Sequence, residues 1–226
     1  EWQLSSLSKA KIENINIVSG YLSNKFDRYN IPKIYNKNWN SMNMLSSLEV
    51  ARSWLLDSKE VIICYSDIIY EPIVIQKLIR SKSDIATVID IDWKNYWFDR
   101  FDNPLEDAET LKLNKNENII DIGRKTNSIK SIEGQYIGIT KLTNKGLKIF
   151  FNVLDQVKEG KKLLYGRSYK DGYITDILYE LIKKEFIINS VKIKGNWLEI
   201  DSAKDLLIAN NIISSNSTRI NKDAIW

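Results

Sequence analysis

Two aspartates occupy matching places in the sequence, because Asp67 and Asp201 each directly follow a predicted strand and directly precede a predicted helix. Open α/β sheets bind ligands at the carboxyl ends of their strands. If the two strands are neighbours, the carboxylates meet and repel each other unless a cation lies between them. Mg²⁺ takes few protein carboxylates and completes its shell with phosphate oxygens and water, so the pair predicts a Mg²⁺–triphosphate site. The alternative is that Asp67 is an ordinary loop acid and Asp201 a helix-entry residue.

The segment 92–112, DWKNYWFDRFDNPLEDAETLK, combines aromatic rings with charge and has no clear periodicity. We expect it to be an insertion or a long connection, and long ordered loops often carry function. Trp93, Tyr96 and Trp97 could form an aromatic cage for a cationic group. The alternative is that these rings are hydrophobic cover for the sheet edge.

The charged residues of the same segment could recognise a zwitterionic substrate. Arg100 could bind a carboxylate or a phosphate, while the acids that follow it could bind an ammonium group. These acids are Glu106, Asp107 and Glu109. The alternative is a charge network on the protein surface.

Two further candidate residues lie at the ends of predicted strands. Lys125 follows the predicted strand 118–123 and could neutralise phosphate charge, or it could be an exposed lysine without a specific role. Trp197 lies in the segment that leads to Asp201, and it is either a core residue or a wall of the site.

The composition excludes several classes of mechanism. The 226 residues contain no His, which removes every mechanism that needs an imidazole base in this chain and every His-ligated zinc site. The net charge of +4 comes without a run of Lys or Arg, so nucleic-acid binding is not predicted. The apolar runs are too short for a membrane span. Cys64 is the only cysteine, so no intramolecular disulfide can form and a cytoplasmic location is expected.

The hydrophobic pattern predicts strands that alternate with helices, which is typical of a layered α/β fold in a single domain. The run 61–65 lacks polar residues and is interpreted as a central strand buried on both faces. Gly195-Asn196 favours a hairpin turn within 191–200, and Ser202 with Asp205 has the spacing of a capping box. The predicted strands are 15–18, 61–65, 84–91, 118–123, 135–141 and 191–200, and the predicted helices are 1–13, 44–57, 72–81, 143–158, 173–185 and 203–212.

Several short motifs, in this order and spacing, resemble a known family. They are IVSGY (17–21), NWNSMNMLSSL (38–48), YSDIIY (65–70), RFDNPLEDAETLK (100–112), GQYIGI (134–139) and GNWLEIDSAKDL (195–206). Together they resemble nucleotidyltransferases of the sugar-nucleotide pyrophosphorylase type. The resemblance is closest to the small cytidylyltransferases that activate phosphocholine, 2-aminoethylphosphonate or phosphoglutamine. The segment NPLEDAETLK looks most like the phosphoglutamine branch.

The resemblance implies a Rossmann-like three-layer fold with a mixed, mostly parallel central sheet. It also implies that Asp67 and Asp201 hold Mg²⁺ and that Lys125 contacts phosphate. Residues implied to lie near the nucleotide are Asn43, Ser47, Ser66 and Asp67. Residues implied to contact the acceptor are Trp97, Arg100, Glu106, Asp107, Glu109, Tyr136 and Trp197.

The resemblance also implies an N-terminal segment that this sequence does not contain. Members of the family begin with a strand and a Gly-rich loop that carries an Arg and, a little later, a Pro-Lys pair. Backbone N–H groups of that loop wrap the triphosphate. This sequence starts where the first helix would start, so we expect it to be truncated at its N-terminus. The alternative is a degenerate member of the family.

These expectations combine into one predicted reaction. A phosphate or phosphonate oxygen of a small amino-bearing acceptor attacks the α-phosphorus of CTP in line, and pyrophosphate leaves. The acceptor is already ionised at neutral pH, so no general base is needed and the lack of His is no handicap. The alternatives are a sugar-1-phosphate nucleotidyltransferase and a non-catalytic nucleotide-binding module. We expect a monomer or homodimer without nucleic-acid or membrane partners, and the resemblance implies a product for a capsule or surface glycan.

Overall fold

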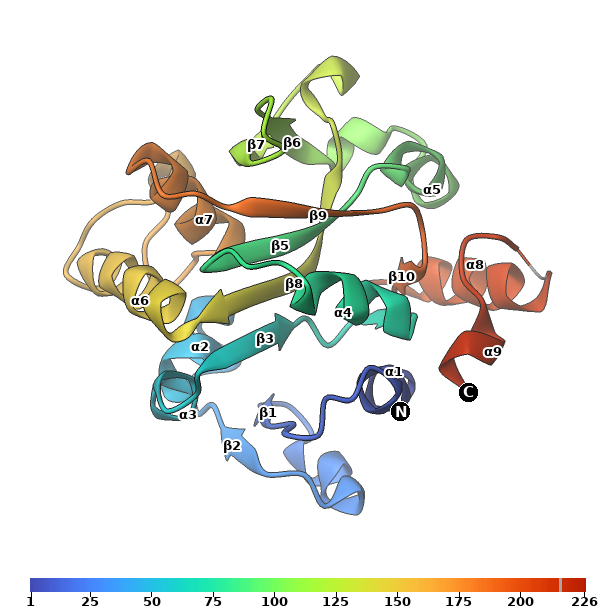
Figure 1. Cartoon of the computed structure of the whole chain (residues 1–226), viewed down its shortest axis with the longest axis horizontal. Coiled ribbons are helices and arrows are strands. Elements are labelled where there is room, and N and C mark those ends of the chain that lie inside the picture. Colours follow the sequence, from blue (N-terminus) through green and yellow to red (C-terminus); the bar gives the residue numbers. More distant parts are fainter. Residues whose placement is uncertain (216) are drawn as a thin grey trace. The chain divides into compact units, whose positions relative to one another are not determined.

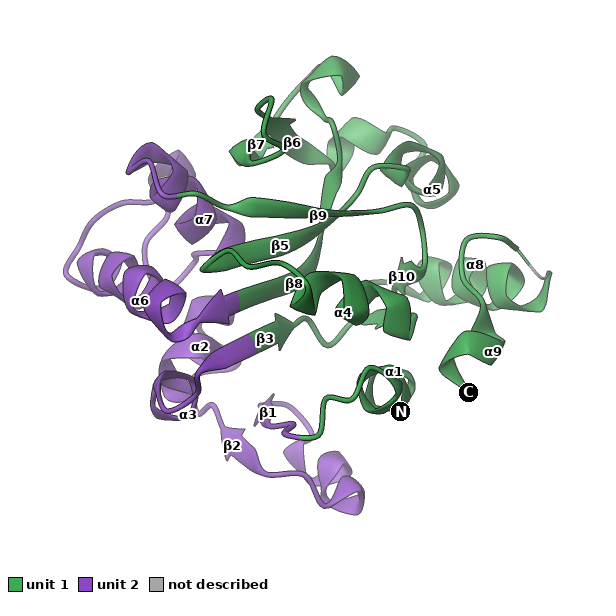
Figure 2. Cartoon of the chain, viewed as in Figure 1, with its two compact units in different colours: residues 1–13, 62–141, 187–226 green, residues 14–61, 142–186 purple. Residues whose placement is uncertain are grey.

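The computed structural model describes residues 1–215 and 217–226. These residues form two compact units, shown in Figure 2. Unit 1 comprises Glu1–Glu13, Ile62–Lys141 and Ile187–Trp226, and unit 2 comprises Asn14–Val61 and Leu142–Phe186. The expected single domain over residues 1–226 stays a prediction, and each unit is described by itself below.

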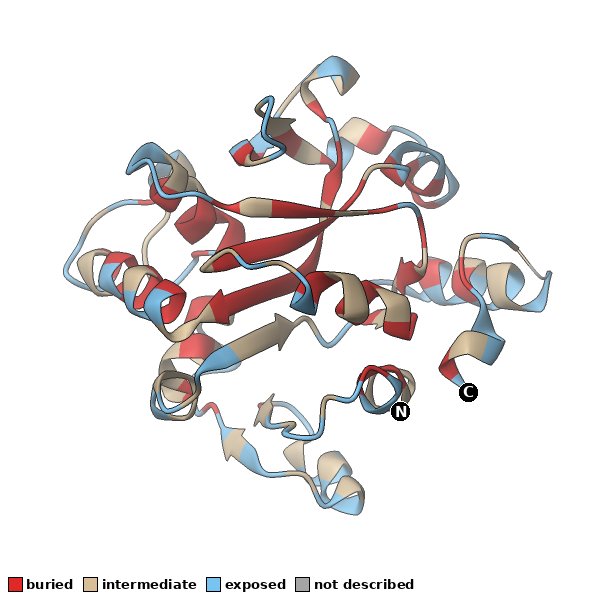
Figure 3. Ribbon diagram, in the orientation of Figure 1, coloured by how far each residue is buried: buried red, intermediate tan, exposed pale blue. Residues whose placement is uncertain are grey.

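Unit 1 is built on a four-stranded sheet with the strand order β3-β8-β5-β9 (Figure 1). Its strands are β3 (Glu60–Cys64), β5 (Ile85–Asp90), β8 (Gln135–Thr143) and β9 (Asn189–Ile193). β5 and β9 pair in parallel, and every residue of β5 is buried (Figure 3). Buried, apolar-rich strands are typical of a parallel sheet that is covered on its faces. The predicted α/β class with a mixed, mostly parallel sheet is confirmed.

The prediction that residues 61–65 form a central, fully buried strand is wrong. β3 is the first strand in the order of its sheet, and its residues Val61–Cys64 are only partly buried. An uninterrupted apolar run does not distinguish a central strand from a terminal one, because both can bury side chains on two faces. The central positions belong to β8 and β5.

The predicted hairpin around Gly195-Asn196 is also wrong. β9 pairs with β5, whereas β10 (Trp197–Glu199) pairs antiparallel with β4 (Ile68–Tyr70), a strand the sequence did not predict. Gly195 and Asn196 both have a φ of 66°, and a side chain at Gly195 would meet the backbone of Arg219. The dipeptide therefore redirects the chain from one sheet to another. As a consequence, Asp67 precedes a strand, and not a helix as expected.

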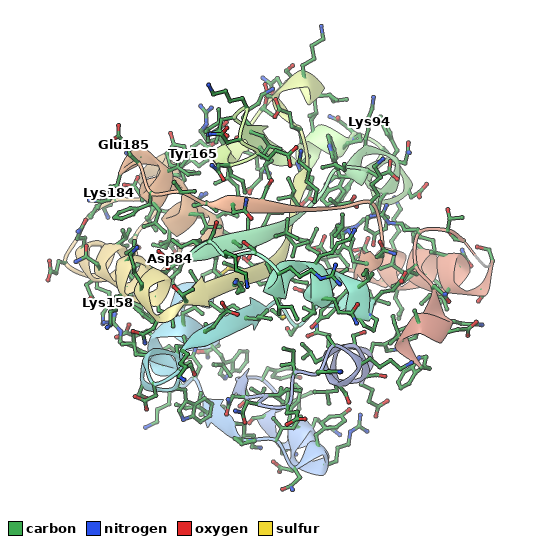
Figure 4. All side chains as sticks on the ribbon, viewed as in Figure 1. Asp84, Lys94, Lys158, Tyr165, Lys184 and Glu185 are labelled. Atoms are coloured by element: carbon green, nitrogen blue, oxygen red, sulfur yellow. The ribbon has the colours of Figure 1, made fainter. Side chains whose placement is uncertain are left out.

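The segment 92–112 is regular where a loop was expected. Trp93, Tyr96, Trp97 and Arg100 form the buried face of helix α5 (Trp93–Arg100). Their spacing of three and four residues is the helical repeat, which the charge of Arg100 obscured. Lys94, in contrast, lies on the exposed side of the same helix (Figure 4). A short 3-10 helix, η2 (Pro104–Glu106), then leads to the antiparallel pair β6 (Glu109–Leu113) and β7 (Ile119–Lys125).

The remaining helices of unit 1 include both ends of the chain. The predicted capping box of α8 (Ala203–Ser214) is confirmed, with Ser202 and Asp205 capping each other. The C-terminal residues are also held in place, since Ile225 is fully buried and the Asn221 N–H donates to Glu71 Oε1 at 2.8 Å. The elements are α1 (Trp2–Lys9), α4 (Pro72–Ile79), η3 (Ile129–Ser131), α8 (Ala203–Ser214) and α9 (Lys222–Ile225).

Unit 2 combines a small parallel pair of strands with helices. The predicted helix 44–57 is two helices that meet at Ala51, where the first helix has its C-cap. Glu180 of α7 is a buried acid held by the ammonium groups of Lys161, at 2.7 Å, and Lys183, at 3.1 Å. The elements are β1 (Ile17–Ser19), η1 (Ser23–Tyr29), β2 (Lys33–Tyr35), α2 (Met44–Val50), α3 (Arg52–Leu56), α6 (Asn144–Lys158), η4 (Leu164–Gly166) and α7 (Ile174–Lys183). None of the described helices has the length and apolar character needed to cross a bilayer.

Candidate active site

The antiparallel pairing of β4 with β10 brings Asp67 and Asp201 together in unit 1. The register aligns Glu199 with Ile68, and the pairing continues with a hydrogen bond of 2.8 Å from the Ile200 N–H to the Asp67 carbonyl. Continuing this register by one more position places Asp201 opposite Ser66, the residue before Asp67. The two aspartates therefore lie at the same end of this strand pair, as the expected metal site requires.

The electrostatics of Asp67 reflect this neighbour. Partial burial raises the pKa of Asp67, and the charge of Asp201 raises it further, while the Asp67 backbone N–H and Arg100 act in the opposite direction. The charge of Asp201 thus acts on the Asp67 carboxylate, which is the arrangement that a cation between them would stabilise. Residues 1–215 and 217–226 hold no cluster of three metal-binding side chains. Two carboxylates suffice for Mg²⁺ when phosphate oxygens and water complete its shell, so this pair fits the ion.

Arg100 contacts Asp201 of this pair, and its guanidinium is fully buried. Its side chain is 0% exposed, and it binds the carboxylates of Glu199, Asp201 and Asp205. Nη2 lies 2.8 Å from Asp201 Oδ2, and Nε lies 2.9 Å from Asp205 Oδ1. Burial alone would lower the pKa of Arg100, but the hydrogen bond to Asp205 and the charge of Glu199 outweigh it, so the group stays charged. Arg100 has no exposed surface with which to meet an acceptor directly.

The aromatic residues of α5 pack around Arg100 and do not form an open cage. Tyr96 and Trp97 are 1% and 3% exposed, and each ring centre lies 5.5 Å from the Arg100 guanidinium. The Tyr96 hydroxyl also bonds both the N–H and the carbonyl of Glu199, at 2.9 and 3.1 Å. These rings therefore hold the strand that carries the acids, and the cation they face belongs to the protein.

Trp197 is a core residue with a polar anchor. It is 0% exposed, and its Nε1–H donates to Asp90 Oδ2 at 2.9 Å. The same carboxylate accepts from the Gly195 N–H at 3.2 Å and pairs with Arg219 at 2.6 Å. Of the two readings that the sequence left open, the structure places Trp197 in the core, where it fixes the start of β10.

Lys125 and the acids of the 104–109 region form a separate group within unit 1. The Lys125 ammonium donates to the backbone carbonyls of Glu106 and Asp107, both at 3.2 Å. The Asp107 carboxylate in turn accepts from Trp97 Nε1–H at 2.9 Å. The predicted role of Lys125 at phosphate stays a prediction.

Glu109 and Tyr136 line a small cavity of about 50 Å³ beside Tyr65. The Tyr136 ring meets the Tyr65 ring edge-on at 5.7 Å, and the Tyr136 hydroxyl lies 3.1 Å from Thr140 Oγ1. Burial raises the pKa of Tyr65, and the charges of both Glu109 and Asp67 add to the rise. Tyr65 therefore lies close to Asp67 and to these two predicted acceptor residues.

Unit 2 contains the other predicted nucleotide residues, Asn43 and Ser47. The Asn43 N–H donates to the Lys170 carbonyl at 2.8 Å, and Ser47 Oγ accepts from Asn36 Nδ2 at 3.1 Å. Asn43 opens onto a pocket of about 480 Å³ that combines aromatic and cationic side chains. The pocket is lined by Trp39, Asn40, Ser41, Met42, Asn43, Arg167, Lys170, Asp171 and Tyr173.

Comparison with known proteins identifies the family. No family model matches the sequence. The chain is 36% identical to the CTP:phosphoglutamine cytidylyltransferase of Campylobacter jejuni over 219 residues, which cover 91% of this chain and 84% of the relative. The chain belongs to the cytidylyltransferase family. It is accordingly an enzyme of the nucleotidyltransferase class.

Solved structures confirm the fold of this cytidylyltransferase. The CTP:phosphocholine cytidylyltransferase of Streptococcus pneumoniae is 18% identical, with a TM-score of 0.70 over 93% of this chain and 83% of that one. The inositol-1-phosphate CTP transferase of T. maritima is 16% identical, with a TM-score of 0.67 over 97% and 83%. At these identities the likeness establishes the fold, which is the predicted Rossmann-like nucleotidyltransferase fold.

The sequence reasoning missed several residues of this cytidylyltransferase. In unit 1 they lie near the candidate metal pair. Glu199 and Asp205 were not candidates, although the strand period places Glu199 on the same side as Asp201. That spacing was the available signal. In unit 2 the missed residues are Arg167, Lys170 and Tyr173, which line the pocket beside Asn43. Their signal was the Lys- and Tyr-rich stretch between the two predicted helices.

Proposed function

We propose that the protein transfers CMP from CTP to a small phosphorylated, amino-bearing acceptor such as phosphoglutamine, in a Mg²⁺-dependent reaction. The observation that carries the proposal is the meeting of Asp67 and Asp201 at one end of the β4–β10 pair. The name of the Campylobacter jejuni relative supports CTP and phosphoglutamine as the substrates to test first. A cytoplasmic location and a role in making a capsule or surface glycan belong to the same proposal.

The chemistry needs positioning and charge neutralisation more than acid–base catalysis. An oxygen of the acceptor phosphate forms a bond to the α-phosphorus of CTP, and the bond from that phosphorus to the bridging oxygen of pyrophosphate breaks. The products are a CDP-linked acceptor and pyrophosphate. Asp67 and Asp201 would hold Mg²⁺, which supplies charge neutralisation at the phosphates when it is bound. The acceptor oxygen is already ionised, so no residue has to remove a proton.

The remaining candidate residues receive binding roles in this proposal. In unit 2, Asn43 and Ser47 would contact the nucleotide, and the pocket beside Asn43 has the aromatic and cationic lining that a nucleotide requires. In unit 1, Ser66 would contact the nucleotide. Acidic side chains and a tyrosine would bind the ammonium group of the acceptor, and Lys125 its phosphate. These acceptor residues are Glu106, Asp107, Glu109 and Tyr136.

The test is pyrophosphate release by the full-length protein in the presence of Mg²⁺. Each NTP is offered with phosphoglutamine, phosphocholine, 2-aminoethylphosphonate or glucose-1-phosphate. We expect release with CTP and an amino-bearing acceptor, and a loss of at least about 10²-fold in Asp67→Asn and Asp201→Asn, since each removes a proposed ligand of the metal. Asp27→Asn is the control, because Asp27 is an exposed acid of unit 2 that pairs with Lys33.

Three outcomes would contradict the proposal. Release only with glucose-1-phosphate would make the protein a sugar-1-phosphate nucleotidyltransferase. Full activity in both Asp67→Asn and Asp201→Asn would remove the proposed metal site. No release with any pair, from folded protein that binds nucleotide, would indicate a binding module.

A further inference from the structure

The most heavily bonded charged group near the candidate metal pair is Arg100, and the sequence had suggested it as a substrate contact. Its burial and its three carboxylate partners point to another role. We infer that Arg100 is a positioning residue that fixes the Asp201 carboxylate for binding a divalent cation. The inference rests on the proposed function, because it takes Asp67 and Asp201 as the ligands.

Asp205 anchors Arg100 on the same edge of the guanidinium that contacts Asp201. Asp205 holds its Nε at 2.9 Å and is itself fixed by the N-terminus of α8. Asp205 Oδ2 accepts from the Ser202 N–H at 3.0 Å, from Ser202 Oγ at 2.8 Å and from the Asp201 N–H at 3.2 Å. The guanidinium is therefore tied to a helix end that cannot move independently of Asp201.

The contact to Asp201 uses only one of its two oxygens. Arg100 Nη2 lies 2.8 Å from Oδ2, and the Asp201 side chain remains 49% exposed. A carboxylate held through one oxygen keeps the other oxygen in a fixed direction for a cation. Groups that orient metal ligands in this way typically change metal affinity by about 10- to 100-fold when they are removed.

The planar fork of Arg100 is what allows three contacts at once. One edge of the guanidinium faces Asp205 and Asp201, and Nη1 faces Glu199. A Lys ammonium carries the same charge but is a compact group on a flexible stem, and it cannot reach all three carboxylates. A change from Arg to Lys therefore separates geometry from charge.

The experiment measures binding of Mn²⁺ to the full-length protein without nucleotide or acceptor, from the electron paramagnetic resonance signal of free Mn²⁺. Mn²⁺ prefers the same oxygen ligands and octahedral geometry as Mg²⁺. We expect Arg100→Lys to weaken binding about 10- to 100-fold. The matched control is Arg52→Lys, because Arg52 also pairs with two acids, Glu49 and Asp155, but lies in unit 2. Its Mn²⁺ affinity should equal that of the wild type.

A second variant guards against a failure of Arg100→Lys to fold. Asp205→Glu keeps the charge and keeps the capping box, since Ser followed three residues later by Glu is a preferred pair at a helix start. The longer side chain displaces Arg100 by about one bond length, so we expect a several-fold weaker Mn²⁺ affinity. Wild-type affinity in folded Arg100→Lys or in folded Asp205→Glu would overturn the inference.

The same titration distinguishes this inference from the proposed function. If wild-type protein binds Mn²⁺, Asp67→Asn abolishes binding and Arg100→Lys leaves it unchanged, then the metal site stands and only the role of Arg100 fails. If Asp67→Asn and Asp201→Asn bind Mn²⁺ as the wild type does, the proposed metal site fails and the inference fails with it.

Discussion

Replacement of Gly138 by Ala should be among the most destabilising single-methyl changes in unit 1. Gly138 lies within β8 at a φ of +79°, where an L side chain is strained. An added Cβ would lie 2.6 Å from Tyr65 Cγ and 2.7 Å from Tyr65 Cδ2, about 1 Å inside ordinary carbon–carbon contact. The neighbour cannot simply move aside, because the Tyr65 N–H donates to the Gly138 carbonyl at 2.9 Å.

The expected cost has two parts. Left-handed backbone costs a residue with a side chain about 1–2 kcal/mol, and overpacking of a well-filled site costs about 1–3 kcal/mol. Gly138→Ala should therefore lower the free energy of unfolding by about 2–5 kcal/mol. Gly166 is the matched control, since its φ is +71° and nothing lies within 4 Å of the added Cβ. Gly166→Ala should show the backbone cost alone, about 1–2 kcal/mol.

Urea unfolding of the two variants measures the difference from the shift in midpoint at an unchanged slope. An equal loss of stability in Gly138→Ala and Gly166→Ala would refute the argument from the close approach of Tyr65. The strain also has a functional consequence, because Tyr65 is followed two residues later by Asp67. If the chain relieves the clash by shifting Tyr65, Mn²⁺ affinity should fall in Gly138→Ala and not in Gly166→Ala.

Three other predictions concern stability and reactivity. Trp197→Phe keeps an aromatic side chain but removes the indole N–H that Asp90 accepts and part of the buried ring volume. Urea unfolding should therefore show a loss of at least about 1–3 kcal/mol, and an unchanged midpoint would contradict this. Burial acts to raise the pKa of Glu180, but its two lysine partners outweigh burial and lower the pKa. The ionised Glu180 therefore stabilises the folded state above the unfolded pKa, and this stabilisation is lost as the pH falls through the folded pKa. Between about pH 7 and about pH 3, the free energy of unfolding should therefore fall less in Glu180→Gln than in the wild type. Burial raises the pKa of Cys64 to about 11 from 9.0, so at pH 8 a disulfide reagent should label the native thiol about 100-fold more slowly than the unfolded one, whereas equal rates would show an accessible thiolate.

Local sequence pattern was sufficient for most of the elements. The Pro72 start of α4, the Ser202–Asp205 capping box of α8 and the buried run of β5 follow from rules that involve only neighbouring residues. The failures occur where pairing between distant segments decides the outcome. Whether the run 61–65 becomes a central or a terminal strand depends on where β8 pairs, and no residue within 61–65 carries that information.

The sequence predicted that the two aspartates lie close together from a local rule, the position directly after a strand. The reason was incomplete, since Asp67 precedes the unpredicted strand β4. It is the pairing of β4 with β10 that brings the carboxylates together. The resemblance to cytidylyltransferases named the same two residues, and that agreement is stronger than either argument alone.

The role of Arg100 shows what local reasoning could not supply. Its type and its acidic neighbours in sequence suggested a substrate contact, because Arg is the side chain best suited to carboxylate and phosphate. In the structure it does bind carboxylates, but they come from residues about a hundred positions later, at the end of β10 and the start of α8. Trp93, Tyr96 and Trp97 have helical spacing with Arg100, and in the structure all four lie on the buried face of α5. A buried guanidinium needs acidic partners, and the strand period supplies two of them in Glu199 and Asp201. Helical and strand periods together thus indicate a protein partner for Arg100, while the choice of partner depends on the fold.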